Sequence, residues 1–223
     1  MLAPKEIRHP ADLASYIDHT ILRPDAGRAD VLRWCDEARQ HRFRSVCVNP
    51  IHVPLVHGRL AGSGVLTCSV VAFPFGATPT AAKVAETELV VAAGADEVDM
   101  VIAVGALKDG DLDGVRADIA AVKRACGDRV LKVIIETCAL TEAEKVAACR
   151  LSQEAGADFV KTSTGYGSAG ATAEDVALMR RTVGDAMGVK ASGGIRSYAD
   201  ALRMIQAGAS RIGASASTTL IQG

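Results

Sequence analysis

The sequence predicts a closed (β/α)8 barrel, a TIM barrel, in which residues 1–223 form a single domain. Eight short apolar runs alternate with segments of helical periodicity, and no Pro/Ser-rich linker interrupts the series. An open doubly wound sheet is the alternative, but the Gly-x-Gly-x-x-Gly turn that would favour it is missing after the first run. Strand–helix alternation implies parallel strands, and eight such units can close a sheet on itself.

Each predicted strand is a short apolar run bounded by polar, Gly or Pro residues. The runs lie at 16–20, 45–48, 65–72, 97–102, 130–135, 158–161, 189–191 and 211–213. The segments between them carry apolar residues three and four apart, which is helical spacing. After a short N-terminal helix at 12–16, the predicted helices are 28–41, 53–60, 80–93, 111–126, 141–155, 172–183 and 197–207. Thr141 and Glu144 have the spacing of a capping box.

A weak repeat indicates how three of the strands are aligned. Ala-Gly-Ala recurs at 93–95, 155–157 and 207–209, each time between a helix and a strand. The glycine can adopt the left-handed conformation that ends a helix. Five residues past each glycine stand Asp99, Lys161 and Gly213. Because alternate strands supply one layer of a barrel, we expect Asp99 and Lys161 to face each other, with Gly213 leaving space between them.

Charge and cysteine content narrow the class of protein. The net charge of −1 gives no electrostatic case for nucleic acid or an acidic membrane as a partner. The six cysteines form no Cys-x-x-Cys pair, which favours reduced thiols in a cytoplasmic protein. No apolar run is long enough to span a bilayer, and residues 1–10 do not have the pattern of a signal peptide.

Lys161 is the first candidate for chemistry, because it directly follows a buried apolar run. At the carboxyl end of a barrel strand, an amine has either a partner or a chemical role. Lys190 lies at the end of the next predicted strand, and its positive charge would disfavour protonation of Lys161. A neutral amine attacks carbonyls to form a Schiff base, and Asp99 would carry the protons. The structural alternatives are a lysine that reaches from the strand end to solvent and a buried Lys–Asp ion pair.

Two glycine-rich turns predict a phosphate site. Gly193-Gly194 follows the seventh strand, and Gly213 with Ser215 follows the eighth. Backbone N–H groups in these two loops form the usual phosphate site of such barrels. The flexible segment 164–170 is expected to cover the site.

Two further residues have open assignments. Asp18 is a second carboxylate expected at the same rim, or an aspartate that caps a turn or helix. Cys47 lies near a strand end and either lines the pocket or packs in the core. No His/Cys cluster has metal-ligand spacing, so neither a metal nor a cofactor is expected.

Motifs through nearly the whole chain resemble those of the deoxyribose-phosphate aldolases, a family of class I aldolases. The matching segments are 16–20, 46–50, 73–76, 97–101, 132–136, 159–165, 190–196 and 213–215. By matching motifs, the resemblance implies that Lys161 is the Schiff-base lysine, Lys190 the neighbour that favours its neutral form, and Asp99 the proton-transfer carboxylate. Substrate and phosphate binding are then expected at Asp18, Thr20, Cys47, Thr164, Gly165, Gly193, Gly194, Gly213 and Ser215.

The resemblance also implies a reaction and an assembly. The expected activity is reversible cleavage of 2-deoxy-D-ribose 5-phosphate to acetaldehyde and D-glyceraldehyde 3-phosphate, in deoxyribonucleoside catabolism, without a cofactor. A cytoplasmic homodimer or homotetramer is expected. The chain has Ser168-Ala169-Gly170 where family members often carry Thr-Gly-Gly. Two other functions stay open at this point: a phosphate-binding isomerase or synthase that uses its lysines only as charges, and a non-catalytic barrel that serves as a scaffold.

Overall fold

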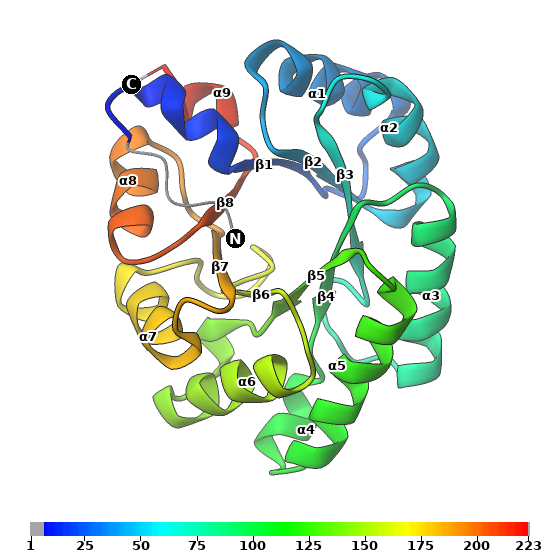
Figure 1. Cartoon of the computed structure of the whole chain (residues 1–223), viewed down its shortest axis with the longest axis vertical. Coiled ribbons are helices and arrows are strands. Elements are labelled where there is room, and N and C mark those ends of the chain that lie inside the picture. The colour runs from blue at the N-terminus through cyan, green and yellow to red at the C-terminus, as the bar shows by residue number, and fades with distance from the viewer. Residues whose placement is uncertain (1–6, 223) are drawn as a thin grey trace.

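The architecture of residues 7–222 comes from a computed structural model (Figure 1). Eight strands pair in chain order, all in parallel, and the last pairs with the first. The strands are β1 (Ile17–Ile21), β2 (Ser45–Val48), β3 (Leu66–Val71), β4 (Glu97–Val101), β5 (Val130–Ile134), β6 (Phe159–Lys161), β7 (Gly188–Ser192) and β8 (Arg211–Ala214). The predicted (β/α)8 barrel is therefore confirmed.

Helices form a ring around the barrel (Figure 1). The longer ones are α1 (Arg28–His41), α2 (Val53–Leu60), α3 (Thr80–Ala92), α5 (Leu112–Cys126), α6 (Glu142–Glu154), α7 (Ala173–Val183) and α8 (Tyr198–Gln206). The N-terminal helix is the 3-10 helix η1 (Pro10–Tyr16). The sequence did not indicate three short elements: the 3-10 helices η2 (Pro50–His52) and η3 (Thr137–Ala139), and the helix α4 (Val104–Lys108). A short helix, α9 (Ser217–Leu220), begins just after Ser215.

Local signals in the sequence set several helix ends. At the start of α6, Thr141 Oγ1 accepts a hydrogen bond from the Glu144 amide at 3.3 Å, and Glu144 Oε2 accepts one from the Thr141 amide at 2.7 Å. This reciprocal pair is the predicted capping box. At the repeated Ala-Gly-Ala joints, the glycines adopt positive φ angles of 104° at Gly94, 80° at Gly156 and 114° at Gly208. Each of these helices therefore ends at the glycine and releases the chain into the next strand.

Burial follows from this arrangement. The strands are buried almost throughout, because side chains inside the barrel pack on one another and those outside pack under the helices. Leu131, Val133 and Ile135, for example, belong to the apolar core, whereas Lys132 between them is equally buried but charged. Within residues 7–222 no helix has the length and apolar character needed to cross a membrane.

Strand register brings the charged residues of the interior together. Asp99 on β4 is aligned with Lys132 on β5, and Lys161 on β6 is aligned with Lys190 on β7. A Cβ atom at Gly213 would lie 3.0 Å from Lys190 Cε. The sequence analysis expected Gly213 to leave space between Asp99 and Lys161. In the structure, the space at Gly213 accommodates the Lys190 side chain.

Candidate active site

The centre of the candidate site is one carboxylate oxygen shared by two amines. Asp99 Oδ2 accepts hydrogen bonds from Lys161 Nζ at 2.8 Å and from Lys190 Nζ at 2.7 Å. Lys190 Nζ also pairs with Asp18 Oδ2 on β1. Asp99 and Lys190 are fully buried, and Lys161 is 3% exposed. The predicted approach of Asp99 and Lys161 is thus present in the structure, with Lys190 beside both.

A second set of charges lies under this centre. Lys132 Nζ lies 2.7 Å from both Asp99 Oδ1 and Glu97 Oε2. Arg211 Nη1 contacts Asp18 Oδ1 at 2.6 Å and Glu97 Oε2 at 2.9 Å, and its Nη2 contacts Glu97 Oε1 at 3.2 Å. We refer to the whole set as the barrel charge network. It consists of Asp18, Glu97, Asp99, Lys132, Lys161, Lys190 and Arg211.

The network fixes the charge of most of its members. Burial by itself would raise the pKa of Asp99, but Lys132, Lys161 and Lys190 hold that pKa well below its usual range. Burial likewise opposes the charge of Lys190, yet Asp18 and Asp99 raise its pKa above the usual value. The pKa of Lys132 is raised well above its usual value, despite burial, mainly by Asp99. Ionised carboxylates and protonated partners therefore stabilise one another.

The network holds four cationic side chains but three carboxylates. Lys132, Lys190 and Arg211 each contact at least two of these carboxylates, whereas Lys161 contacts Asp99 alone. An uncompensated charge in a dry interior is costly, so the network is balanced when one cation loses its proton. Lys161 therefore has the fewest charged partners of the four cations.

Lys161 faces a cavity of about 490 Å³ at the carboxyl ends of the strands. This is the end of such barrels at which catalysis takes place. The loops after β1, β6, β7 and β8 contribute most of the lining. Of the nine predicted binding residues, the structure brings seven to this cavity: Thr20, Thr164, Gly165, Gly193, Gly194, Gly213 and Ser215.

Glycines let the loops after β6 and β7 approach each other closely. A Cβ atom at Gly170 would lie 2.2 Å from the Gly193 carbonyl oxygen, so no other residue fits there without movement. The Ala171 amide donates to the carbonyl groups of Ser192 and Gly193. Gly193 and Gly194 have φ angles of 85° and 77°, which glycine adopts at little cost.

The loop after β6 is held across the mouth of the cavity. Thr164 Oγ1 bonds to the Glu136 carboxylate, and the Tyr166 amide donates to Thr164 Oγ1 at 3.0 Å. The Tyr166 hydroxyl donates to the Leu22 carbonyl at 2.9 Å, and its ring packs edge-on against Phe73. These contacts connect the loops after β1, β3, β5 and β6, and Thr164, Gly165 and Tyr166 line the cavity. That segment 164–170 covers the site stays a prediction.

Asp18 is not at the rim, and that expectation was wrong. It is the second residue of β1 rather than a residue at its end, because the strand runs to Ile21. Asp18 is fully buried, is not among the cavity-lining residues, and accepts a hydrogen bond from Ser45 Oγ at 2.7 Å besides its pairs with Lys190 and Arg211. Asp18 therefore belongs to the charge network, and its predicted contact with substrate stays a prediction.

Cys47 is not among the residues that line the cavity, and its role in substrate binding stays a prediction. It is aligned with Cys68 on the neighbouring strand, and both are fully buried. The two sulfur atoms and an Asp99 oxygen lie within 4.8 Å of one another, a spacing that could suit a metal ion. Both Asp99 oxygens, however, already accept hydrogen bonds from lysines, which leaves an unfavourable electrostatic environment for a cation.

Several residues of the site were missed by the sequence analysis. Lys132, Glu97 and Arg211 were read only as parts of strands, although charged residues inside apolar runs could have drawn attention to them. Arg196 lines the cavity next to Gly194. Among residues 7–222, no carboxylate oxygen lies within 4.0 Å of the Arg196 guanidinium, so its charge is available to an anion there.

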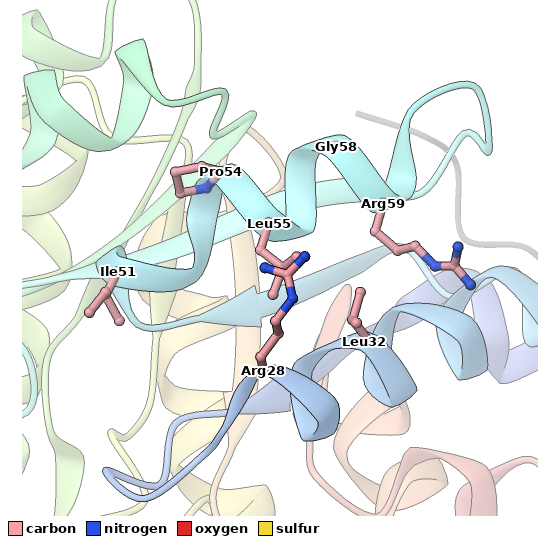
Figure 2. A pocket seen from close by; sticks show the side chains of 7 residues that line it. All are labelled: Arg28, Leu32, Ile51, Pro54, Leu55, Gly58 and Arg59. Atoms are coloured by element: carbon pink, nitrogen blue, oxygen red, sulfur yellow. The ribbon is translucent and has the colours of Figure 1, made fainter.

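A larger hollow, of about 670 Å³, lies outside the barrel between α1 and α2 (Figure 2). It is a surface groove lined by Arg28, Leu32, Ile51, Pro54, Leu55, Gly58 and Arg59. Arg59 is paired with Asp36 at 2.6 Å. The groove contains no amine–carboxylate cluster, so the cavity at the barrel mouth is the candidate active site despite its smaller volume.

Comparison with known proteins identifies the family. A family model described as DeoC/LacD family aldolase matches residues 13–223. The chain belongs to this aldolase family. A Rhodospirillum rubrum protein named deoxyribose-phosphate aldolase is 69% identical over 211 residues, which cover 95% of this chain and 89% of that protein. A Brevibacillus brevis protein of the same name is 58% identical, with 95% of this chain and 96% of that protein covered. The resemblance stated from motifs, and the expectation of an aldolase, are confirmed.

Solved structures agree with this aldolase assignment. The crystal structure of a putative deoxyribose-phosphate aldolase from Coccidioides immitis has a TM-score of 0.94 at 40% identity, covering 100% of this chain and 87% of that one. A tetrameric deoxyribose phosphate aldolase from Aeropyrum pernix has a TM-score of 0.88 at 35% identity, covering 96% and 91%. A mandelate oxidase at 14% identity, with a TM-score of 0.62, shares the fold alone.

Proposed function

We propose that this aldolase cleaves 2-deoxy-D-ribose 5-phosphate reversibly to acetaldehyde and D-glyceraldehyde 3-phosphate, through a Schiff base on Lys161. The observation that carries the proposal is the shared contact of Lys161 and Lys190 with Asp99 Oδ2, with only Lys161 facing the cavity. Two amines at one oxygen, one of them accessible, match the requirement for a neutral nucleophile beside a fixed positive charge.

The first steps form the imine. The neutral Lys161 amine attacks the aldehyde carbon of the open-chain sugar, and the resulting carbinolamine loses water to give a protonated imine. Asp99, in contact with the amine, transfers the protons that this dehydration requires. Lys190 stays protonated and keeps Asp99 ionised in the resting site.

The cleavage step then breaks the bond between C2 and C3 of the sugar. The C3 hydroxyl loses its proton and becomes the aldehyde of glyceraldehyde 3-phosphate, while the bond electrons pass into an enamine on the Lys161 nitrogen. Protonation of that enamine carbon gives the acetaldehyde imine, and water releases acetaldehyde and the free lysine. The imine nitrogen acts as the electron sink, and Asp99 is the nearest carboxylate for the proton transfers.

The phosphate is proposed to bind at the opposite part of the cavity. Gly193, Gly194 and Ser215 line it after β7 and β8, and the Arg196 guanidinium is the unpaired cation of this region. Backbone N–H groups at close-approaching glycines, with a guanidinium, suit a phosphate dianion. Because the phosphate is remote from the breaking bond, its binding energy holds the sugar in place for the reaction at Lys161.

We also propose a cytoplasmic homodimer or homotetramer that acts in deoxyribonucleoside catabolism. All six cysteines are unpaired, in agreement with a reducing compartment. The assembly is supported by the Aeropyrum pernix relative, whose structure is described as tetrameric. Light scattering coupled to size-exclusion chromatography, over a range of protein concentrations, measures the assembly directly, and a monomer throughout would contradict this part of the proposal.

The decisive experiment traps the imine. The protein is incubated with acetaldehyde, reduced with borohydride, digested and sequenced by mass spectrometry. We expect an ethyl group on Lys161 and none on Lys190 or Lys132. Lys83, a fully buried lysine outside the barrel, provides an internal control that should stay unmodified. Modification of Lys190 in place of Lys161, or of neither, would overturn the proposed mechanism.

A further inference from the structure

Arg211 has no part in the mechanism above, yet it contributes a fixed positive charge to the barrel interior. It is 6% exposed and lies at the first position of β8, whereas Gly213 and Ala214 of the same strand line the cavity. Its guanidinium bridges Asp18 and Glu97 and lies 5.3 Å from the centre of the Phe159 ring. Burial lowers its pKa, but Asp18 and Glu97 raise it above the usual value, so its charge is permanent.

We propose that Arg211 is a positioning residue whose permanent charge keeps Lys161 in its neutral, reactive form without touching the substrate. This inference rests on the proposed Schiff-base function. Arg211 provides the fourth cation for three carboxylates. Two chains of ion pairs connect it to the reacting amine: one passes through Asp18, Lys190 and Asp99, and the other through Glu97, Lys132 and Asp99.

Charge balance within the network connects Arg211 to the protonation of Lys161. With Arg211 present, the three carboxylates are already neutralised by Lys132, Lys190 and Arg211, so a proton on Lys161 would be in excess. Without Arg211, the same carboxylates would need Lys161 as their third cation, and its proton would be retained. Interactions of this kind are only weakly screened, because the whole network is 7% exposed or less and lies in a medium of low dielectric constant.

The groups that face the network are few. Around Arg211 they are Asp18 and Glu97, and around Lys161 they are Asp99 and Lys190. The thiols of Cys47 and Cys68 also lie within electrostatic reach. A hydrogen bond with Cys68 lowers the pKa of the Cys47 thiol, whereas burial raises the pKa of Cys68 well above its usual value.

The test varies the charge of the network in both directions. Arg211→Met removes one positive charge and should move the acid limb of the kcat/KM profile to higher pH. Glu97→Gln removes one negative charge and should move it to lower pH. The double variant Arg211→Met/Glu97→Gln restores the original balance and should return the limb close to its wild-type position. We expect single-variant shifts of about 1 pH unit each, from a charge acting over roughly 10 Å at an effective dielectric constant of about 20.

Arg211→Lys is the matched conservative control, because it retains the charge while losing the planar contacts. The pH of its acid limb should differ from that of the wild type by only a small fraction of the shift expected for Arg211→Met. A purely structural role would instead lower activity in every variant and leave the pH of the limb unchanged, or move it in the same direction for both single variants. Either result would overturn the inference. If Arg211→Met does not fold, the Glu97→Gln and double variants still show in which direction the charge of the network moves the acid limb.

The outcome separates this inference from the proposed function. Borohydride trapping at Lys161 is repeated in each variant over a range of pH. If the imine forms on Lys161 but the acid limb of the kcat/KM profile does not move with the charge of the network, the role of Arg211 is rejected. The aldolase mechanism then remains in place. No imine on Lys161 in the wild type would reject the mechanism itself. If imine formation in the charge variants shifts with pH in the same way as kcat/KM, both the role of Arg211 and the Schiff-base mechanism are supported.

Discussion

Two buried lysines in this molecule have similar burial but different surroundings. Lys83 on α3 lies outside the barrel, donates to Asp118 Oδ2 on α5 at 2.7 Å and to the Val101 carbonyl at 3.0 Å, and is fully buried. Lys161 lies inside the barrel, shares the one carboxylate it contacts with Lys190 and Lys132, and faces a cavity. Lys83 is the one lysine paired with Asp118, whereas Lys161 shares Asp99 with two other lysines.

The difference shows that burial of a lysine does not by itself indicate chemistry. The pair of Lys83 and Asp118 is balanced, and Thr80 Oγ1 occupies the second Asp118 oxygen at 2.7 Å. Such a pair connects two helices and is closed to any ligand. The barrel charge network is unbalanced by one positive charge and open at one position. Excess charge together with access distinguishes a reactive lysine from a structural one.

The largest expected effect comes from Lys161→Met. Turnover of 2-deoxyribose 5-phosphate should fall on the order of 10⁴-fold or more, because the covalent intermediate can no longer form. Stability should not fall, because the variant leaves three cations for three carboxylates. Steady-state assays and thermal unfolding measure the two properties. Substantial residual turnover, or a large loss of stability, would mean that Lys161 is a structural lysine like Lys83. The proposed difference between the two lysines would then be wrong.

Lys190→Leu should reduce kcat/KM at neutral pH by about 10²-fold, with a displacement of the acid limb to higher pH by about 1 to 3 units. The sign follows from charge: loss of a neighbouring cation favours the proton on Lys161, so a higher pH is needed to remove it. A pH–rate profile from acid to alkaline conditions checks this. An unchanged profile would mean that Lys190, like Lys83, has only a structural role.

Ser215→Glu tests the cavity and leaves the network intact. A carboxylate in the proposed phosphate site should raise KM for the phosphorylated sugar on the order of 10²-fold through repulsion. Unphosphorylated 2-deoxyribose has no anion to repel, so its kcat/KM should change far less. Measurement of kcat/KM for both sugars in the wild type and the variant shows how much more the phosphorylated sugar is affected. Equal losses would place the phosphate elsewhere than after β7 and β8.

Lys83→Met should have the smallest effect on activity and a clear effect on stability. Removal of one member leaves Asp118 charged and buried, which costs about 3–5 kcal/mol of unfolding free energy. The double variant Lys83→Met/Asp118→Leu removes both charges and should recover most of that loss. Below the unfolding temperature, kcat should match the wild type. Denaturant unfolding together with kcat tests this, and a catalytic defect in the folded variant would contradict the comparison.

The sequence by itself determined the fold class and the central residues of the site. Alternating strand and helix segments indicated the barrel, because each apolar period specifies one kind of element. Lys161, Lys190 and Asp99 could be selected because a charged residue in or just after an apolar strand is conspicuous. The common depth of Asp99 and Lys161 could be inferred because Ala-Gly-Ala ends the preceding helix in the same way in both cases, which fixes the distance along the chain to the strand interior.

Only the tertiary structure decided how these charges are balanced. Asp18 was misplaced because β1 continues to Ile21, so its carboxylate lies inside the barrel and not at the end of the strand. Lys132, Glu97 and Arg211 were missed because the side chains that meet inside a barrel depend on the tilt and stagger of eight strands. Those quantities are properties of the closed sheet. No local pattern could show that three carboxylates meet four cations, or that Lys161 is the one facing the cavity.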